Sequence, residues 1–342
     1  MLSTFYIPTM NNKITKWVFW VLFLTSITIG VVIWSLTVGS SGIPAGKVFT
    51  VLFRGTAGPE YDIIFNIRLP RIILGFAIGG ALSLAGILLQ GMFRNPLVEP
   101  YTLGISGGAG LGVSLNILLG FYQIGVLTLP FSGFLGAIVV LAIVYVLSLR
   151  RGSSQLQGLL LTGVMMSFVC SSVMMLIMAI SRTEDLHGII FWVMGSLEES
   201  NWLMIKITLI VSVFFLVIAH FFCLDLNALS LGEEEAQHLG IHVERTKRLL
   251  FIMTSLLTGF CVSVAGIIGF VGLVVPHFIR VFIGNDHRVS LVAAFLAGGA
   301  FLIFCDTLAR TMIAPLELPV GVITGIIGGG LFIYMLAKRG KR

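Results

Sequence analysis

Residues 72–92 read IILGFAIGGALSLAGILLQGM, which is 21 consecutive positions without a charged side chain. A helix of about 20 residues rises about 30 Å and matches the hydrocarbon core of a bilayer. The stretch therefore predicts a transmembrane helix. Residues 17–37 form a second such run, which lacks the cleavage pattern of a signal peptide and is expected to remain as a helix.

The composition of the whole chain is typical of a membrane protein. Hydrophobic residues make up 57% of the 342 residues and charged residues 11%, against roughly 25% charged in ordinary soluble domains. So few charges could not cover the surface of a soluble fold. The four cysteines lie inside apolar runs, which indicates small buried side chains and not a disulfide framework. The net charge of +6 fits basic loops at a membrane surface and requires no nucleic-acid partner.

We expect one all-α, polytopic membrane domain over residues 1–342, with about ten transmembrane helices and a short cytoplasmic tail at residues 1–16. The predicted spans are residues 17–37, 72–92, 103–120, 131–149, 159–181, 203–223, 249–268, 270–283, 290–312 and 319–337. As a single helix, residues 249–283 would overshoot a bilayer, so the glycines within residues 266–272 predict a break there.

Ten spans place both termini on the same side of the membrane. Fourteen Lys and Arg residues then lie on that side and six on the other, while Lys206 lies within a span. Cytoplasmic loops carry the excess of basic residues, so both termini are expected in the cytoplasm. Nine spans would leave the basic C-terminal tail outside.

A short sequence motif occurs twice in the chain, as SLAGI at residues 83–87 and SVAGI at residues 263–267. The two spans that carry it run in opposite directions, which is the arrangement of inverted-repeat transporters. Motifs of small residues also recur by chance in glycine-rich spans. The sequence therefore leaves open whether the halves are inverted repeats.

Ionisable residues inside the spans are few. Asp306 has Arg310 one turn later, a spacing that allows an ion pair on one helix face. Ion-coupled carriers usually need a buried carboxylate that is not already paired. The sequence also lacks an H-E-x-x-H metal motif, and SGIPAGK at residues 41–47 lacks the residues of a phosphate-binding loop. A chain that could form a transport pathway but has no energy source of its own is typical of a subunit that a partner drives.

Six blocks that follow one another along the chain resemble a single family. They are RLPR at 68–71, GALSLAGILLQGMFRNPLVEPYTLGISGGAGLG at 80–112, ALSLGEEEAQHLGI at 228–241, GFVGLVVPHFIRV at 269–281, DHR at 286–288 and ELPVGVITGIIGG at 317–329. With these blocks the chain resembles the permease subunits of ATP-binding-cassette (ABC) importers for iron-siderophores, haem and vitamin B12.

The resemblance implies a homodimer of ten-span subunits in the plasma (inner) membrane of a prokaryote. It also implies two cytoplasmic ATPase subunits and an extracytoplasmic substrate-binding protein as partners. ATP and Mg would be bound by the ATPase, so this chain is expected to bind no cofactor or metal and not to be an enzyme. A ferric siderophore is the expected cargo, and haem and vitamin B12 are the alternatives within the family. A stand-alone secondary carrier and a non-transporting scaffold are the rivals from other classes.

The acidic stretch between the sixth and seventh spans lies in an expected cytoplasmic loop, residues 225–248. Ser230 is placed to cap a short helix, the glutamates in its first turn complement the helix dipole, and Gly240 is placed to end it. The resemblance implies that this element is the coupling helix that fits a cleft on the ATPase. The residues concerned are Leu231, Gly232, Glu233, Glu234, Glu235, Ala236, Gln237, His238, Leu239 and Gly240. A solvated loop is the alternative.

Two further sites follow from the resemblance. Arg68, Arg71 and Arg310 match positions that receive acidic residues of the binding protein at the outer face. Interfacial arginines that reach the lipid headgroups are the alternative. The positions that match the cytoplasmic gate are Asn95, Leu97, Gln155 and Leu156, and an ordinary turn is the alternative. Pro70 is expected to begin the second span, because proline is tolerated in the first turn of a helix.

Overall fold

The computed structural model describes residues 10–39, 42–54, 58–149, 155–199 and 201–339. Ten helices correspond one to one with the ten predicted spans. They are α1 (Met10–Thr37), α4 (Leu69–Phe93), α5 (Ile105–Leu118), α6 (Thr128–Leu149), α7 (Gln155–Ile180), α9 (Trp202–Phe221), α12 (Val243–Ala265), α13 (Val271–Phe282), α14 (His287–Thr311) and α15 (Val320–Arg339). The prediction of an all-α membrane fold is confirmed.

Shorter helical elements connect these ten helices. They are α2 (Ala45–Arg54), α3 (Pro59–Asp62), the π-helix η1 (Ile63–Arg68), the 3₁₀ turns η2 (Pro100–Leu103) and η3 (Phe121–Ile124), α8 (Thr183–Met194), α10 (Cys223–Leu231) and α11 (Glu233–His238). Within the described ranges, seven helices are long and apolar enough to cross a membrane, while α5, α13 and α15 are shorter apolar helices.

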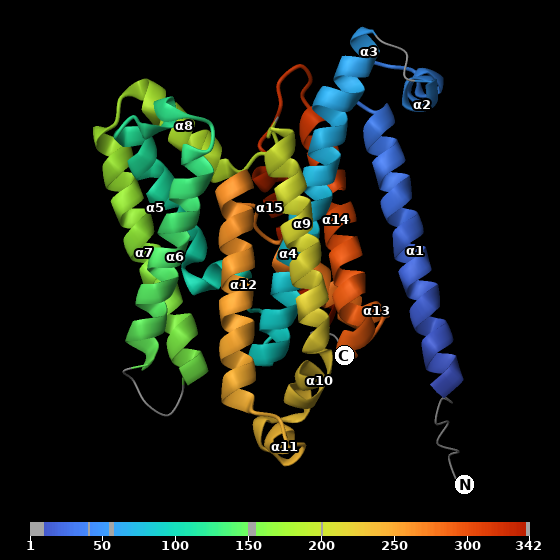
Figure 1. Ribbon diagram of the computed structural model, residues 1–342, viewed down its shortest axis with the longest axis vertical. Coiled ribbons are helices and arrows are strands. Elements are labelled where there is room, and N and C mark those ends of the chain that lie inside the picture. Colours follow the sequence, from blue (N-terminus) through green and yellow to red (C-terminus); the bar gives the residue numbers. More distant parts are fainter. Residues whose placement is uncertain (1–9, 40–41, 55–57, 150–154, 200, 340–342) are drawn as a thin grey trace.

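The helices form a bundle with two distinct ends (Figure 1). The α8 end carries α2, α3 and α8, and the α11 end carries α10 and α11. Helix α1 begins, and α15 ends, on the side of the α11 end. Helices α4 and α12 run in opposite directions, as expected. The repeated motif, however, lies in the middle of α4 and at the end of α12, so its two copies are not structurally equivalent.

Two predicted boundaries were wrong. Helix α1 begins at Met10, inside the predicted N-terminal tail of residues 1–16. The second span does not begin at Pro70, because the chain is already helical from Pro59 through α3 and η1. Pro70 is the second residue of α4 and follows the π-helix η1 directly. The wide turns of a π-helix leave room for the pyrrolidine ring, so the helical path continues through the proline.

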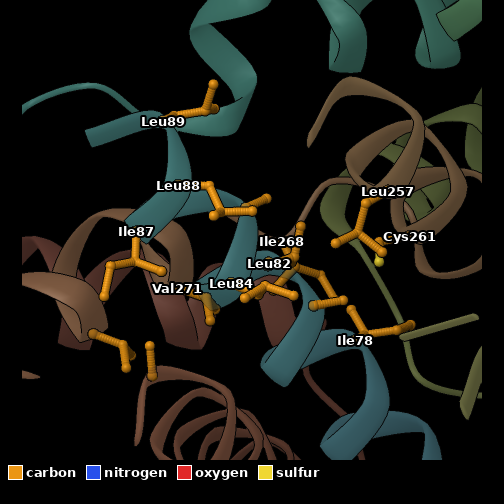
Figure 2. Close-up of a cluster of buried hydrophobic side chains, with 14 of the residues drawn as sticks. Ile78, Leu82, Leu84, Ile87, Leu88, Leu89, Leu257, Cys261, Ile268 and Val271 are labelled. Carbon is orange, nitrogen blue, oxygen red and sulfur yellow. The ribbon is translucent and has the colours of Figure 1, made fainter. Parts of the chain in front are cut away.

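Helix α4 is the central element of the bundle. In its most apolar 18-residue window 89% of the residues are buried, against 11% in α1 at the periphery. Its neighbours are α9, α12, α13 and α14. Figure 2 shows Ile78 and Leu82 of α4 beside Leu257 and Cys261 of α12 and Ile268 of the segment that follows α12. A helix that is apolar on all sides belongs in the interior of a bundle, and α4 lies there.

Glycines set the distance between α4 and its neighbours. A Cβ atom on Gly86 would lie 1.9 Å from the carbonyl oxygen of Gly272 in α13, and one on Gly79 would lie 2.3 Å from that of Gly298 in α14. Lipid supplies little hydrophobic drive for helices to associate, so small residues that allow close backbone contact take over this role.

The predicted break between the seventh and eighth spans is confirmed. Helix α12 ends at Ala265, Gly266 has a φ of +70°, and α13 begins at Val271 after Phe270 with a φ of +67°. The four cysteines are free thiols that are buried in the structure, as the sequence indicated.

A glycine substitution tests the close packing of α4. Gly86→Ala places a methyl group on the Gly272 carbonyl and forces α4 and α13 apart, which is expected to destabilise the fold by about 1–3 kcal/mol. The melting temperature of the detergent-purified protein should fall by several degrees. The control is Gly30→Ala in α1, where the added Cβ meets nothing within 4 Å. Equal melting temperatures for Gly86→Ala and the control would contradict the packing argument.

Candidate functional site

The acidic stretch folds as part of a small helical unit. Helix α10 is followed by α11, which contains the three glutamates, and α12 begins at Val243. Buried Leu229, Ala236 and Val243 come from these three helices and form one apolar cluster. The predicted loop at residues 225–248 is therefore two packed helices and the first turns of α12, with a hydrophobic core of its own.

The capping prediction at Ser230 was wrong. The Ser230 hydroxyl donates a hydrogen bond to the carbonyl of Asn227 in α10, and the N-cap of α11 is Gly232. Gly232 has a φ of +151°, and a Cβ there would lie 1.8 Å from a carboxylate oxygen of Glu235. The turn between α10 and α11 thus requires glycine, which leaves no side chain to cap α11. Gly240, with a φ of +84°, follows the end of α11 as expected.

Among the three glutamates, Glu233 makes the ion pair that seats α11. Its carboxylate lies 2.6 Å from the Lys247 ammonium of α12, and the Lys247 side chain is only 7% exposed. A buried ammonium is costly without a partner, so this pair fixes α11 against α12. Helix α10 is held on its other side, because the Asn227 amide donates to Asp286 and accepts from the backbone N–H of His287 at the start of α14. Motion of α11 therefore reaches both α12 and α14.

The predicted gate loop follows α4 at the α11 end. Arg94 ends the helix with a φ of +51°, and the Asn95 side chain accepts a hydrogen bond of 2.9 Å from the backbone N–H of Leu97. This local turn presents the Leu97 side chain, which is 55% exposed. Gln155 and Leu156 form the start of α7, but their side chains lie outside the described part of the chain. Their proximity to Asn95 and Leu97 therefore stays a prediction.

The same loop is bonded to the break between α12 and α13. The Glu99 carboxylate accepts a hydrogen bond of 2.7 Å from the backbone N–H of Phe270, and the Tyr101 hydroxyl donates to the carbonyl of Ile268 at 2.8 Å. Irregular backbone at membrane depth must find partners inside the protein, and these side chains supply them. Nothing in the sequence indicated this pairing, because 167 residues or more separate the partners.

The buried side-chain amide of Gln90 supplies hydrogen bonds to the first turn of α13. Pro276 has no N–H to donate to the carbonyl of Gly272, four residues earlier. The side-chain Nε2 of Gln90 in α4 donates to this carbonyl at 3.2 Å and to that of Leu273 at 3.3 Å. Gln90 is 1% exposed. The carbonyl that Pro276 leaves without a donor is thus hydrogen-bonded from α4. Gln90 carries no charge, so a reading of the sequence for charged or catalytic groups does not find it.

The three arginines predicted to dock a binding protein lie towards the α8 end, with buried side chains. The Arg71 guanidinium lies 2.7 Å from Glu198 and 2.6 Å from Glu317. Arg310 pairs with Asp306 at 2.9 Å, as the spacing predicted, and the Arg68 side chain donates to the carbonyl of Leu36. Since these arginines are engaged within the chain, an incoming carboxylate would have to displace an acidic residue such as Glu198 from Arg71.

The outward side of this cluster is acidic. The side chains of Glu198 and Glu317 are 60% and 40% exposed, whereas that of Arg71 is 9% exposed. Burial raises the pKa of the Glu198 carboxyl, and the adjacent Glu317 raises it further against the pull of Arg71. Burial also acts upward on the pKa of Glu317, but hydrogen bonds from Glu198 and Arg71 leave it lowered. Glu198 is therefore the member of this pair that takes up a proton first.

Comparisons with known proteins agree along nearly the whole chain. The model of the FecCD transport family matches residues 27–338. The hemin transport system permease protein of Yersinia pestis is 39% identical over 89% of this chain and 92% of its own length. The Fe(3+) dicitrate transport system permease protein of Escherichia coli K12 is 36% identical over 93% and 98%. The cobalamin import system permease protein of Halobacterium salinarum is 40% identical over 82% and 74%.

Two solved structures resemble the fold. An inward-facing structure of a metal-chelate type ABC transporter superimposes with a TM-score of 0.82 at 31% identity, covering 94% of this chain and 99% of that one. The PsaBC complex of Streptococcus pneumoniae has a TM-score of 0.56 at 16% identity, over 80% and 92% of the two chains, and shows a shared fold alone.

The ion pair of Glu233 with Lys247 is open to a direct test. Glu233→Gln leaves Lys247 buried without a counter-charge. Because Glu233 itself is half-exposed, the expected loss is about 1 kcal/mol, or roughly fivefold faster amide exchange across α11. Hydrogen exchange followed by mass spectrometry measures it. The matched control is the exposed neighbour Glu234→Gln, which should leave the exchange unchanged. The same exchange in both variants would show that the ion pair does not hold α11.

Proposed function

Because the chain belongs to the FecCD transport family, we propose that it forms the translocation pathway of an importer for a ferric siderophore or a similar large metal chelate. It is a permease of the metal-chelate ABC importers, and the ATP that drives such an importer is hydrolysed by a separate subunit. The observation that carries the proposal is the superposition on a metal-chelate type ABC transporter over 94% of the chain.

The second part of the proposal concerns which metal chelate is transported. Relatives named for hemin, ferric dicitrate and cobalamin are 39%, 36% and 40% identical to this chain, so overall identity does not rank these chelates. We propose a ferric siderophore as the first cargo to test, with haem and vitamin B12 as the alternatives from the same family.

The arrangement of partners is also proposed. Two copies of the chain would assemble with two ATPase subunits at the α11 end and with a binding protein at the α8 end. The excess of basic residues supports a cytoplasmic position for the α11 end. The contacts of α11 support its role as the coupling helix, because Glu233 pairs it directly with α12, while α10, which packs against it, is hydrogen-bonded to the start of α14. Docking at Arg68, Arg71 and Arg310 would act by exchanging acidic partners at Arg71.

Reconstitution tests the proposed function. The chain is placed in proteoliposomes with its ATPase and binding protein, and uptake is measured for a panel of ferric siderophores, haem and cobalamin. ATP-dependent uptake of at least one chelate, absent without the ATPase, is expected, and the mass of the complex should contain two copies of this chain. Coupled transport by the purified chain alone would support a secondary carrier and contradict the proposal. No flux of any chelate with all partners present would indicate a scaffold.

The gate is tested in the same proteoliposomes. Leu97→Trp adds bulk to a side chain that the Asn95 turn presents, so uptake should fall at least about tenfold while the complex still assembles. This size of effect corresponds to roughly 1.4 kcal/mol on the transport barrier. The control is Leu119→Trp at the end of α5, where the side chain is equally exposed at 59% and lies outside the gate loop. Full uptake by Leu97→Trp would rule out a gate at this position.

A further inference from the structure

A cavity of about 520 Å³ lies near the α11 end, beside the predicted gate loop. It is lined by residues from the end of α4 and the loop that follows it, from α10, and from α13 through to the start of α14. Two arginines, Arg94 and Arg280, and two histidines, His277 and His287, are among the lining residues, and none of the ten is acidic. Its size lies within the range of about 300–1,000 Å³ that is usual for ligand sites.

The two arginines have no acidic partner among the described residues. Arg71, Arg288 and Arg310 form ion pairs within the described ranges, but neither Arg94 nor Arg280 lies within ion-pair distance of a carboxylate there. The Arg280 guanidinium donates a hydrogen bond to the carbonyl of Ile87, at 3.4 Å. A half-buried arginine without a counter-ion at the edge of a cavity favours an anion inside it.

A third polar residue on the lining belongs to α4. Gln90 lines the cavity, and its Nε2 atom donates to the carbonyls of Gly272 and Leu273, which fixes the orientation of the amide. Its Oε1 atom is enclosed by the surrounding protein and does not offer a contact to a ligand in the cavity. The two arginines are therefore the groups that select a ligand here, and a ligand that fits must carry an anionic group.

The edge of the cavity is apolar. Val281, which lines it, is 53% exposed, and the next residue in α13, Phe282, is 55% exposed. Exposed apolar side chains beside arginines mark the border between headgroups and hydrocarbon. Basic pockets between transmembrane helices on the cytoplasmic side are known to hold the headgroups of anionic lipids. A ligand here has room for a polar head inside and acyl chains along α13.

We propose that this cavity binds the phosphate of an anionic phospholipid such as phosphatidylglycerol. Arg94 and Arg280 bind the phosphate. Arg94 directly precedes the loop that contains Asn95 and Leu97, and Arg280 lies in the last turn of α13. The bound lipid would tie this loop to α13.

Native mass spectrometry of the full chain, purified in detergent with equal amounts of phosphatidylglycerol and phosphatidylcholine, tests the site. The wild-type protein should retain phosphatidylglycerol preferentially. Arg280→Gln should lower this preference about tenfold, as expected for the loss of a charge-assisted bond. Arg94→Gln, at an exposed position, should act in the same direction without a risk to folding. The matched control is Arg288→Gln, an exposed arginine at the same end that does not line the cavity.

A second arm separates the two sources of phosphate. Inorganic phosphate added to the lipid-stripped protein should raise its melting temperature only slightly, whereas phosphatidylglycerol should raise it by several degrees, and both shifts should vanish in Arg280→Gln. A full shift with inorganic phosphate and no lipid preference would overturn the lipid assignment and leave a soluble-anion site. Equal retention of the two lipids together with no response to phosphate would overturn the site itself.

Discussion

The close contact of α4 with α13 and α14 is the constraint on which the other features depend. In a membrane the burial of apolar side chains does little to bring helices together, so contact depends on van der Waals packing and on groups that hydrogen-bond across helices. Gly79 and Gly86 bring the neighbouring backbones to α4, and Gln90 then donates to α13 one turn further along the helix. Without the close approach at Gly86, the Gln90 amide could not reach the carbonyl that Pro276 leaves without a donor.

This packing explains how irregular backbone is accommodated in the bundle. The chain between α12 and α13 departs from helical geometry at Gly266 and Phe270, and its backbone groups bond to Glu99 and Tyr101 from the loop after α4. The break and the predicted gate loop are therefore one connected structure. A change in the break alters the hydrogen bonds of the loop, and a change in the loop alters those of the break. The two segments can therefore move together.

The two ends of the molecule use charge in different ways. At the α11 end, Glu233 neutralises a buried lysine, and two arginines around the cavity have no acidic partner in the described chain. Towards the α8 end, Arg71 is shared by two exposed glutamates. Exposed charges near a surface exchange partners readily, because water compensates for each lost contact. Lys247 and Arg71 are both buried and their carboxylate partners are about half-exposed, but Arg71 has two partners and Lys247 has one. One glutamate can therefore leave Arg71 without stranding its charge, whereas the loss of Glu233 leaves Lys247 unpaired.

Four features could be read from the amino-acid sequence: the number of membrane helices, the break at the glycines of residues 266–272, the short helix at the glutamates and the Asp306–Arg310 pair. These features follow from local rules: the length of an apolar run, the conformational freedom of glycine and the 3.6-residue period of a helix. Two predictions from local preference were wrong. The second span does not begin at Pro70, because a π-helix precedes it, and Ser230 does not cap α11, because the turn before α11 is made by Gly232. Three features depend on the packing of the helices: Glu198 and Glu317 share Arg71, Glu233 is the glutamate of α11 that pairs with Lys247, and Arg94 and Arg280 line one cavity with Gln90. These partners are far apart in the chain, and no local pattern encodes which buried polar group will meet which.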